Sequence, residues 1–193
     1  MTRRMLIPLL YLALGLTAIP AQAQQISAET LAQVTDLREG DMRKLVVHDA
    51  PKPAGDVPYL TLDGTEHTIA ESNGKIRIIN FWATWCAPCR HEKPALDTLN
   101  KDLNGPDFDV IAIATGRNSP EGIRKFNAEL GIETLTTYLD NRSAAARRMG
   151  VLGLPVSVVI DRDGNEIARL QGGADWTSDS TRAIMDLLMA GGS

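Results

Sequence analysis

The only two cysteines of the chain, Cys86 and Cys89, lie together in one Cys-x-x-Cys. An apolar run over residues 75–81 precedes the pair, and a helical pattern begins at Ala87. A Cys-x-x-Cys between a strand and a helix is typical of a redox-active dithiol. The helix N-terminus faces Cys86 and favours its thiolate, which is the form that attacks disulfides. We therefore expect Cys86 to attack and Cys89, one turn further along, to be the less exposed resolving thiol.

Two other interpretations of the cysteine pair stay open on the sequence. Half of a zinc site would need two further ligands, and the chain offers only the scattered histidines His48, His67 and His91. An inert structural disulfide is the other interpretation, but so short a loop at a helix start favours a reducible bond. Redox chemistry is therefore the favoured interpretation, and no metal ligand is expected.

The sequence around the cysteines, residues 75–94, resembles exported thioredoxin-like reductases of the TlpA, ResA and CcmG group, and TlpA most closely. The likeness runs from about Leu60, through Gly153-Leu154-Pro155, to residues 172–176. It implies a thioredoxin-like α/β fold, with a central mixed sheet flanked by helices, an added N-terminal β-hairpin and a central insertion. It also implies a cis-proline opposite the dithiol, at Pro155, although only about 5–6% of X–Pro bonds are cis in general.

The first residues indicate an export signal. Arg3 and Arg4 form a positive n-region, residues 5–19 an apolar h-region, and Ala21-Gln22-Ala23 a small-residue cleavage site. The apolar run is slightly shorter than the roughly 20 residues of a usual membrane span, which favours cleavage but leaves anchoring open. We expect residues 1–23 to be a signal peptide or membrane anchor, and the protein to lie in the periplasm, either soluble or anchored to the inner membrane.

The rest of the chain is expected to form one catalytic domain with an N-terminal extension. Residues 24–57 are predicted to be a short helix, over residues 27–37, followed by an extended linker rich in proline. A frayed tether is the alternative to that helix. Residues 58–193 are predicted to be the thioredoxin-like domain.

Hydrophobic periodicity and turn residues predict the elements of that domain. They are a hairpin over residues 59–69, strands over 75–82, 108–114, 135–139, 156–160 and 166–171, and helices over 87–103, 120–130, 142–149 and 178–189. The order strand, helix, strand at 75–114 argues for a parallel part of the sheet, and the two last strands for an antiparallel part.

A client protein needs a flat apolar surface beside the dithiol on which its backbone can dock. The candidates for this substrate-binding surface are Trp85, Ala87, Pro88, Leu154 and Pro155.

Glu92 is the candidate for proton transfer. Thioredoxin has a buried acid where this chain has Asn80, and an amide cannot move protons. The resembling reductases carry an acid after the second cysteine, and the resemblance assigns that role to Glu92. A solvated surface carboxylate that pairs with a nearby lysine or arginine is the alternative for Glu92. We expect His91 to face solvent, Trp82 to pack beneath the site and Trp176 to lie in the core.

The residues between the cysteines bear on the direction of the reaction. Ala87 and Pro88 carry no charge and no side-chain donor. A thiolate that is little stabilised makes a weak oxidant, so the dithiol is expected to be a reductant. The favoured function is reduction of metalloprotein cysteines, during copper-site assembly of cytochrome oxidase or during cytochrome c maturation.

The expected partners follow from the resemblance and from the compartment. They are client proteins with disulfides and a membrane electron donor of the DsbD or CcdA type, since an oxidising periplasm would otherwise hold the pair as a disulfide. No cofactor is expected. Without residues 1–23 the chain has 18 basic and 24 acidic side chains and no basic cluster, which excludes a nucleic-acid role.

A copper-binding chaperone that uses Cys86 and Cys89 as ligands is the alternative function. Dedicated chaperones of this superfamily use Cys-x-x-x-Cys with a distant histidine, and the spacing here is one residue shorter. A peroxidase is disfavoured further, because the chain has no Pro-x-x-x-Thr-x-x-Cys arrangement.

Overall fold

The computed structural model describes residues 26–191. The predicted export signal therefore lies outside the described residues. Among the helices of the described range, none has both the length and the apolar character needed to cross a membrane.

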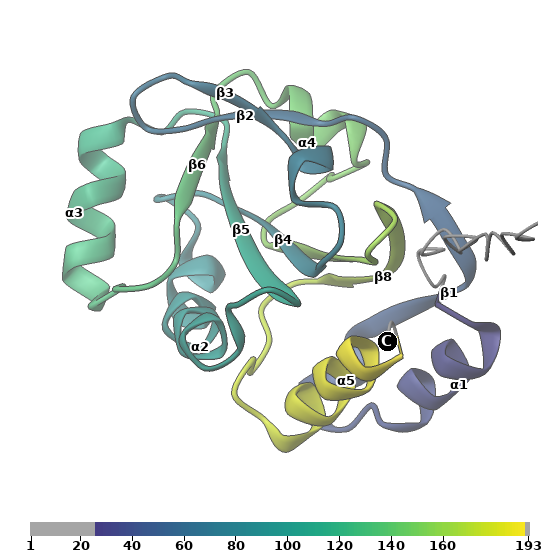
Figure 1. Cartoon of the computed structure of the whole chain (residues 1–193). Helices are drawn as coiled ribbons and strands as arrows, with labels where there is room; N and C mark the ends of the chain where they lie inside the picture. The colour runs from purple at the N-terminus through teal and green to yellow at the C-terminus, as the bar shows by residue number, and fades with distance from the viewer. Residues whose placement is uncertain (1–25, 192–193) are drawn as a thin grey trace, which may run out of the picture.

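A mixed sheet of eight strands runs through the middle of the molecule (Figure 1). Its strand order is β1-β8-β7-β4-β5-β6-β2-β3. The strands are β1 (Leu45–Pro53), β2 (Pro58–Leu60), β3 (Glu66–Thr68), β4 (Ile76–Trp82), β5 (Phe108–Thr115), β6 (Thr137–Asp140), β7 (Val156–Ile160) and β8 (Asn165–Gln171). β4 pairs parallel with β5, and β7 pairs antiparallel with β8, as the sequence predicted. β4 also pairs antiparallel with β7. Every residue of β4 is buried, the polar Arg77 and Asn80 included, as in a central strand covered on both faces.

Helices cover both faces of the sheet. They are α1 (Ala28–Asp36), α2 (Ala87–Leu103), α3 (Pro120–Leu130), α4 (Ala144–Arg148) and α5 (Asp179–Ala190), with the short 3-10 segments η1 (Gly40–Lys44) and η2 (Ile69–Ser72). Ile78 of β4 packs in a core with residues of α1, α2 and α5, whereas its neighbour Ile79 packs in a second core with α4. The alternation of side chains along β4 thus separates the helices, and Figure 1 shows α4 across the sheet from α2.

The helix ends agree with the capping residues in the sequence. Ser119 caps α3 by accepting a hydrogen bond from the Gly122 N–H at 3.0 Å, and Gly131 ends the helix in the left-handed region at φ 65°. α2 has the predicted bounds, with Cys86 as its N-cap residue. The hairpin of β2 and β3 is also confirmed, with Tyr59 opposite His67.

The predicted N-terminal helix is confirmed, and it is packed rather than frayed. α1 begins after Ser27, whose hydroxyl accepts a hydrogen bond from the Thr30 N–H at 3.1 Å. Leu31 and Val34 are buried in the same core as Trp176 and residues of α5. The tether alternative therefore does not apply to α1.

The sequence predicted a linker through Pro51 and Pro53, and for these two residues the prediction was wrong. These residues belong to β1, which pairs antiparallel with β8 at one edge of the sheet. The register shifts between Val47 and Lys52. Proline is tolerated in an edge strand because one side of such a strand needs no ladder hydrogen bond. The prolines therefore pointed to an edge strand as well as to a linker.

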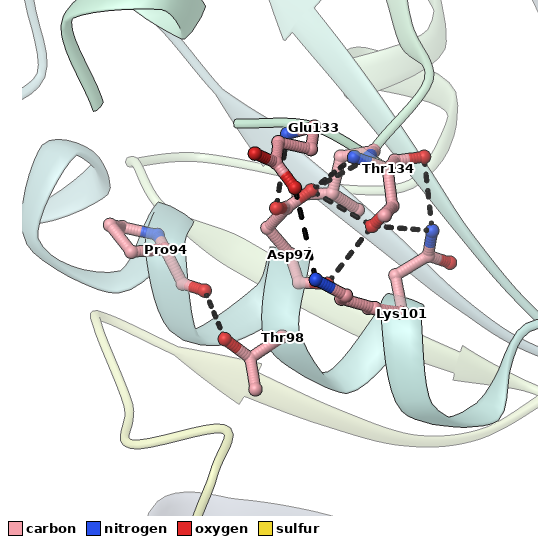
Figure 2. A network of polar contacts seen from close by, with 8 residues as sticks. Pro94, Asp97, Thr98, Lys101, Glu133 and Thr134 are labelled. Atoms are coloured by element: carbon pink, nitrogen blue, oxygen red, sulfur yellow. Dashed lines mark hydrogen bonds and ion pairs between the residues drawn. The ribbon is translucent and has the colours of Figure 1, made fainter. Parts of the chain in front are cut away.

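Asp97 fastens the middle of α2 to the loop that leads into β6 (Figure 2). Its carboxylate accepts hydrogen bonds from the backbone N–H groups of Thr134 and Leu135, both at 2.8 Å, and of Glu133 at 3.1 Å. The Thr134 hydroxyl adds a further bond at 2.9 Å. The helix that begins at the cysteines is thus fixed by a polar contact as well as by its apolar face.

Candidate active site

The two cysteines lie where β4 gives way to α2, and they form a disulfide. Cys86 has extended backbone angles and precedes the first helical residue, and the Cys89 N–H donates to the Cys86 Sγ at 3.3 Å. The turn before them is fixed by Asn118, whose side-chain oxygen accepts hydrogen bonds from the Thr84 N–H and hydroxyl, both at 3.0 Å. The N-terminus of α2 thus faces Cys86, as predicted from the spacing.

The two sulfur-bearing residues differ in their access to solvent. Cys86 is 6% exposed and lines a groove of about 470 Å³, whereas Cys89 is fully buried and does not line it. A client disulfide can therefore approach Cys86 from this groove.

The groove brings together most of the residues predicted for docking. Trp85 is 66% exposed, and Pro88 and Leu154 line the groove with it. Ala87 is exposed at the start of α2 but lines a different cleft, described below. The Leu154–Pro155 bond is cis, which confirms the isomer that the resemblance implied, and Pro155 is buried directly before β7.

Leu152 and Arg147 are among the groove residues that were missed from the sequence. Leu152 is 96% exposed at the edge of the groove, and Arg147 lines it from α4. Leu152 could have been found from the sequence, because it is a large apolar residue two positions before the Leu154–Pro155 pair. No signal in the sequence brought Arg147 to the groove, because its position depends on how α4 packs.

Glu92 is buried, not solvated. Its Oε1 accepts a hydrogen bond from the Asn80 Nδ2 at 2.9 Å, and its Oε2 accepts from the Ala174 N–H and the Trp176 Nε1, both at 3.3 Å. Burial raises the pKa of Glu92 above its ordinary value, and the three donors oppose that rise without cancelling it. The carboxyl group is therefore able to hold a proton at a higher pH than an exposed glutamate.

Glu92 nevertheless borders solvent through a second cleft. This cleft, of about 670 Å³, is lined by Pro88, His91 and Glu92 of α2 on one side and by residues 173–175 on the other. His91 is exposed, as expected. A proton on Glu92 can thus exchange with water on the side of α2 that does not carry the docking groove.

The loop that donates to Glu92 is held in turn by the N-terminal extension. Asp41 of η1 accepts a hydrogen bond from the Asp175 N–H at 3.0 Å, and the Lys44 ammonium donates to the Gly173 carbonyl at 2.5 Å. The sequence pointed to Glu92 but not to this support, which comes from residues far away in the chain.

Lys93, beside Glu92, was not predicted as a site residue. It is fully buried, and its Nζ lies 4.0 Å from the centroid of the Trp82 ring, with no hydrogen-bond partner among residues 26–191. Burial lowers the pKa of Lys93 to about 7, although the carboxylates of Glu92 and Asp97 oppose this effect. A lysine on the apolar face of α2, one turn after Cys89, was the available signal. Trp82 and Trp176 are both buried, as expected.

Within residues 26–191 there is no group of three or more histidine, cysteine, aspartate or glutamate side chains that could hold a metal ion.

Comparisons with known proteins agree with this geometry. A family model described as Redoxin matches residues 47–186. The thiol:disulfide interchange protein HelX of Rhodobacter capsulatus is 33% identical over 119 residues, which cover 62% of this chain and 64% of HelX. The thiol-disulfide oxidoreductase ResA of Geobacillus thermodenitrificans is 30% identical, with 58% of this chain and 63% of ResA covered. The chain thus matches a little under two thirds of the length of both relatives.

A solved structure extends the likeness to the fold. The crystal structure of a thiol:disulfide interchange protein of the thioredoxin family from Chlorobium tepidum TLS is 28% identical and has a TM-score of 0.60. The match covers 72% of this chain and 97% of that one. The predicted α/β fold, thioredoxin-like with a central mixed sheet flanked by helices, is therefore confirmed.

Proposed function

The chain belongs to the Redoxin family, and on this basis we propose that it is an exported thiol:disulfide oxidoreductase that acts as a reductant through Cys86 and Cys89. The observation that carries the proposal is the disulfide at the N-terminus of α2, with Cys86 open to the docking groove and Cys89 buried behind it. One attacking and one protected sulfur are what a two-step exchange requires.

The exchange proceeds in two balanced steps. The Cys86 thiolate of the reduced protein attacks one sulfur of a client disulfide and forms a mixed disulfide, and the other client sulfur leaves as a thiolate and takes up a proton. Cys89 then loses its proton to Glu92 and attacks the Cys86 sulfur, which releases the second client thiolate. Two electrons pass to the client, and the protein is left with the Cys86–Cys89 disulfide that the structure holds.

The proposed clients are exported proteins whose cysteines bind copper or haem, during assembly of cytochrome oxidase or maturation of cytochrome c. The support is the resemblance of the sequence around Cys86 to reductases of that kind and the relatives' names as thiol:disulfide exchange proteins. The proposed location is the periplasm, where a membrane donor of the DsbD or CcdA type would return the disulfide to the dithiol.

The redox potential tests the direction of the reaction. We expect a value nearer the about −270 mV of thioredoxin than the about −120 mV of the strong oxidant DsbA, because Ala87 and Pro88 offer the Cys86 thiolate no charge. Equilibration with glutathione buffers measures it. A value close to that of DsbA would contradict a reductant.

Replacement of Glu92 by glutamine tests the proton-transfer step. The variant is expected to fold, since a glutamine oxygen can accept from Ala174 and Trp176. The glutamine NH₂ can donate to the Asn80 Oδ1, which has no partner among the described residues, once the Asn80 amide turns over and the Ser157 hydroxyl donates to it in place of accepting. Resolution of the mixed disulfide should slow at neutral pH and lose the pH dependence that the raised pKa of Glu92 gives it. Rapid mixing with a disulfide substrate measures the rate across pH. An unchanged pH profile would make Glu92 a structural residue only.

A further inference from the structure

Lys93 carries a buried charge that the mechanism above does not use. The side chain is fully buried, and its Nζ has no hydrogen-bond partner among the described residues. A buried ammonium without a partner costs free energy, and the usual solution is a paired anion. In the oxidised protein this Nζ lies over the face of the Trp82 ring, 4.0 Å from its centroid.

The carboxylates near Lys93 are engaged by other donors. Glu92 accepts hydrogen bonds from Asn80, Ala174 and Trp176. The oxygens of Asp97 accept from the backbone of the loop before β6 (Figure 2). Both carboxylates act on Lys93 through their charge, yet neither forms a hydrogen bond with it. Its amino group thus has no hydrogen-bond partner among the described residues in the oxidised state.

The other cation of this region is directed elsewhere. The Arg90 guanidinium lies 4.8 Å from the centroid of the Phe126 ring of α3 and pairs with the exposed carboxylate of Glu129 at 2.9 Å. Phe126 in turn packs on Trp82, with ring centroids 4.8 Å apart. Arg90 therefore covers the outside of the cluster, while Lys93 is enclosed within it.

The helix places Lys93 next to the resolving cysteine. Cys89 and Lys93 are four residues apart in α2, and side chains at this spacing are neighbours on one helix face. Both are fully buried, and Cys89, Cys86 and Trp82 belong to one apolar cluster. Glu92 is three residues from Cys89, so that a carboxyl group and a lysine lie one helical turn beyond the same sulfur.

We propose that Lys93 is the cationic positioning residue of the dithiol site, whose ammonium stabilises the thiolate of Cys89 once the disulfide has opened. The proposal deepens the function proposed above and rests on it. In the resolving step, Cys89 gives its proton to Glu92, the Cys89 thiolate attacks the Cys86 sulfur, and the bond from Cys86 to the client sulfur breaks. The proton that Lys93 holds beside the Cys89 thiolate supplies the positive charge that the buried anion otherwise lacks.

The charge of Lys93 is expected to lower the pKa of the Cys89 thiol. A neighbouring cation lowers the pKa of a thiol, and the thiolate in turn holds the proton on the lysine. The thiolate concerned is that of the resolving cysteine, so removal of the Lys93 charge should slow resolution more than the first attack on a client. Glu92 acts with the opposite sign, because its ionised form disfavours a second anion.

The test isolates Cys89 in a chain without the attacking thiol. In the Cys86→Ser background, the ultraviolet absorbance of the Cys89 thiolate is titrated with and without Lys93→Met, which keeps an unbranched apolar side chain against Trp82. We expect the Cys89 pKa to rise by about one unit, a tenfold loss of thiolate at a given pH. Lys93→Arg should restore the lower pKa. The matched control is Lys101→Met, on the same helix but 64% exposed, and it should leave the titration unchanged.

The outcomes separate this proposal from the proposed function. If the Cys89 pKa is the same in Cys86→Ser and in Cys86→Ser with Lys93→Met, the role of Lys93 is overturned, even if the wild-type protein reduces client disulfides. A Lys93→Met chain that fails to fold would also overturn it, since the lysine would then serve packing. Failure of the wild-type protein to reduce disulfides would refute the function proposed above, whatever the titration gives.

Discussion

Replacement of Cys86 by serine is expected to abolish disulfide reduction, and replacement of Cys89 by serine to stop the reaction at a covalent adduct with the client. Cys86 lines the docking groove and accepts a hydrogen bond from the Cys89 N–H at the helix N-terminus, so it is the sulfur that a client can reach as a thiolate. Cys89 is fully buried and can reach only the Cys86 sulfur. Without Cys89, the mixed disulfide has no internal thiol to resolve it.

Two measurements check this assignment. Turnover of a disulfide substrate should fall to the background rate in both single variants. Non-reducing electrophoresis of extracts should show adducts with clients for Cys89→Ser and none for Cys86→Ser. Faster labelling of Cys89 than of Cys86 by iodoacetamide in the reduced wild-type protein would reverse the two roles.

Replacement of Asp97 by alanine is expected to lower the free energy of unfolding by about 3 kcal/mol, since buried donors left unpaired cost about 1–3 kcal/mol each. The side chain is 8% exposed, and the backbone N–H groups of Glu133, Thr134 and Leu135 donate to it (Figure 2). Urea unfolding measures the loss. Lys101→Ala is the matched control, because its exposed pair with Glu133 at 3.8 Å should contribute well under about 1 kcal/mol.

The decrease in the free energy of unfolding caused by Asp97→Ala should also depend on pH. Burial raises the pKa of Asp97, but the three backbone donors outweigh burial and hold the pKa below the ordinary value of 3.8. An acid with a lowered pKa in the folded state stabilises the protein above its unfolded pKa, and this part is lost as pH falls through the folded pKa. The difference between wild type and variant should therefore be full at neutral pH and should shrink below about pH 3.8. A loss no larger than that of Lys101→Ala at neutral pH would contradict the role of Asp97.

The elements around the dithiol could be predicted because their signals are local. The buried run before Trp82, the cysteine at the start of α2, and Ser119 and Gly131 at the two ends of α3 each act within a few residues. The cis bond before Pro155 was available only through the resemblance, because the base rate for proline favours trans.

Other features could not be predicted because they depend on distant parts of the chain. The prolines of β1 suited a linker until its pairing with β8 was known. Glu92 could be singled out, but the indole and backbone donors that bury it come from the loop before α5. Lysine is a residue type that usually lies on the surface, and only the packing of α2 on Trp82 encloses the side chain of Lys93.

The residues that contact Glu92 lie far from it in the sequence, and this affects the order in which the site is assembled during folding. Cys86 and Cys89 are three residues apart and can meet in an unfolded chain, whereas the donors to Glu92 are 12, 82 and 84 residues away from it. Contacts across so long a separation form late, after the loops between them have closed. The cysteines of a newly synthesised chain would therefore react as ordinary thiols until the segment that ends at Trp176 has reached its place beside Glu92. Thiol reactivity followed during refolding would thus time the docking of the C-terminal part, although the cysteines themselves lie near the middle of the sequence.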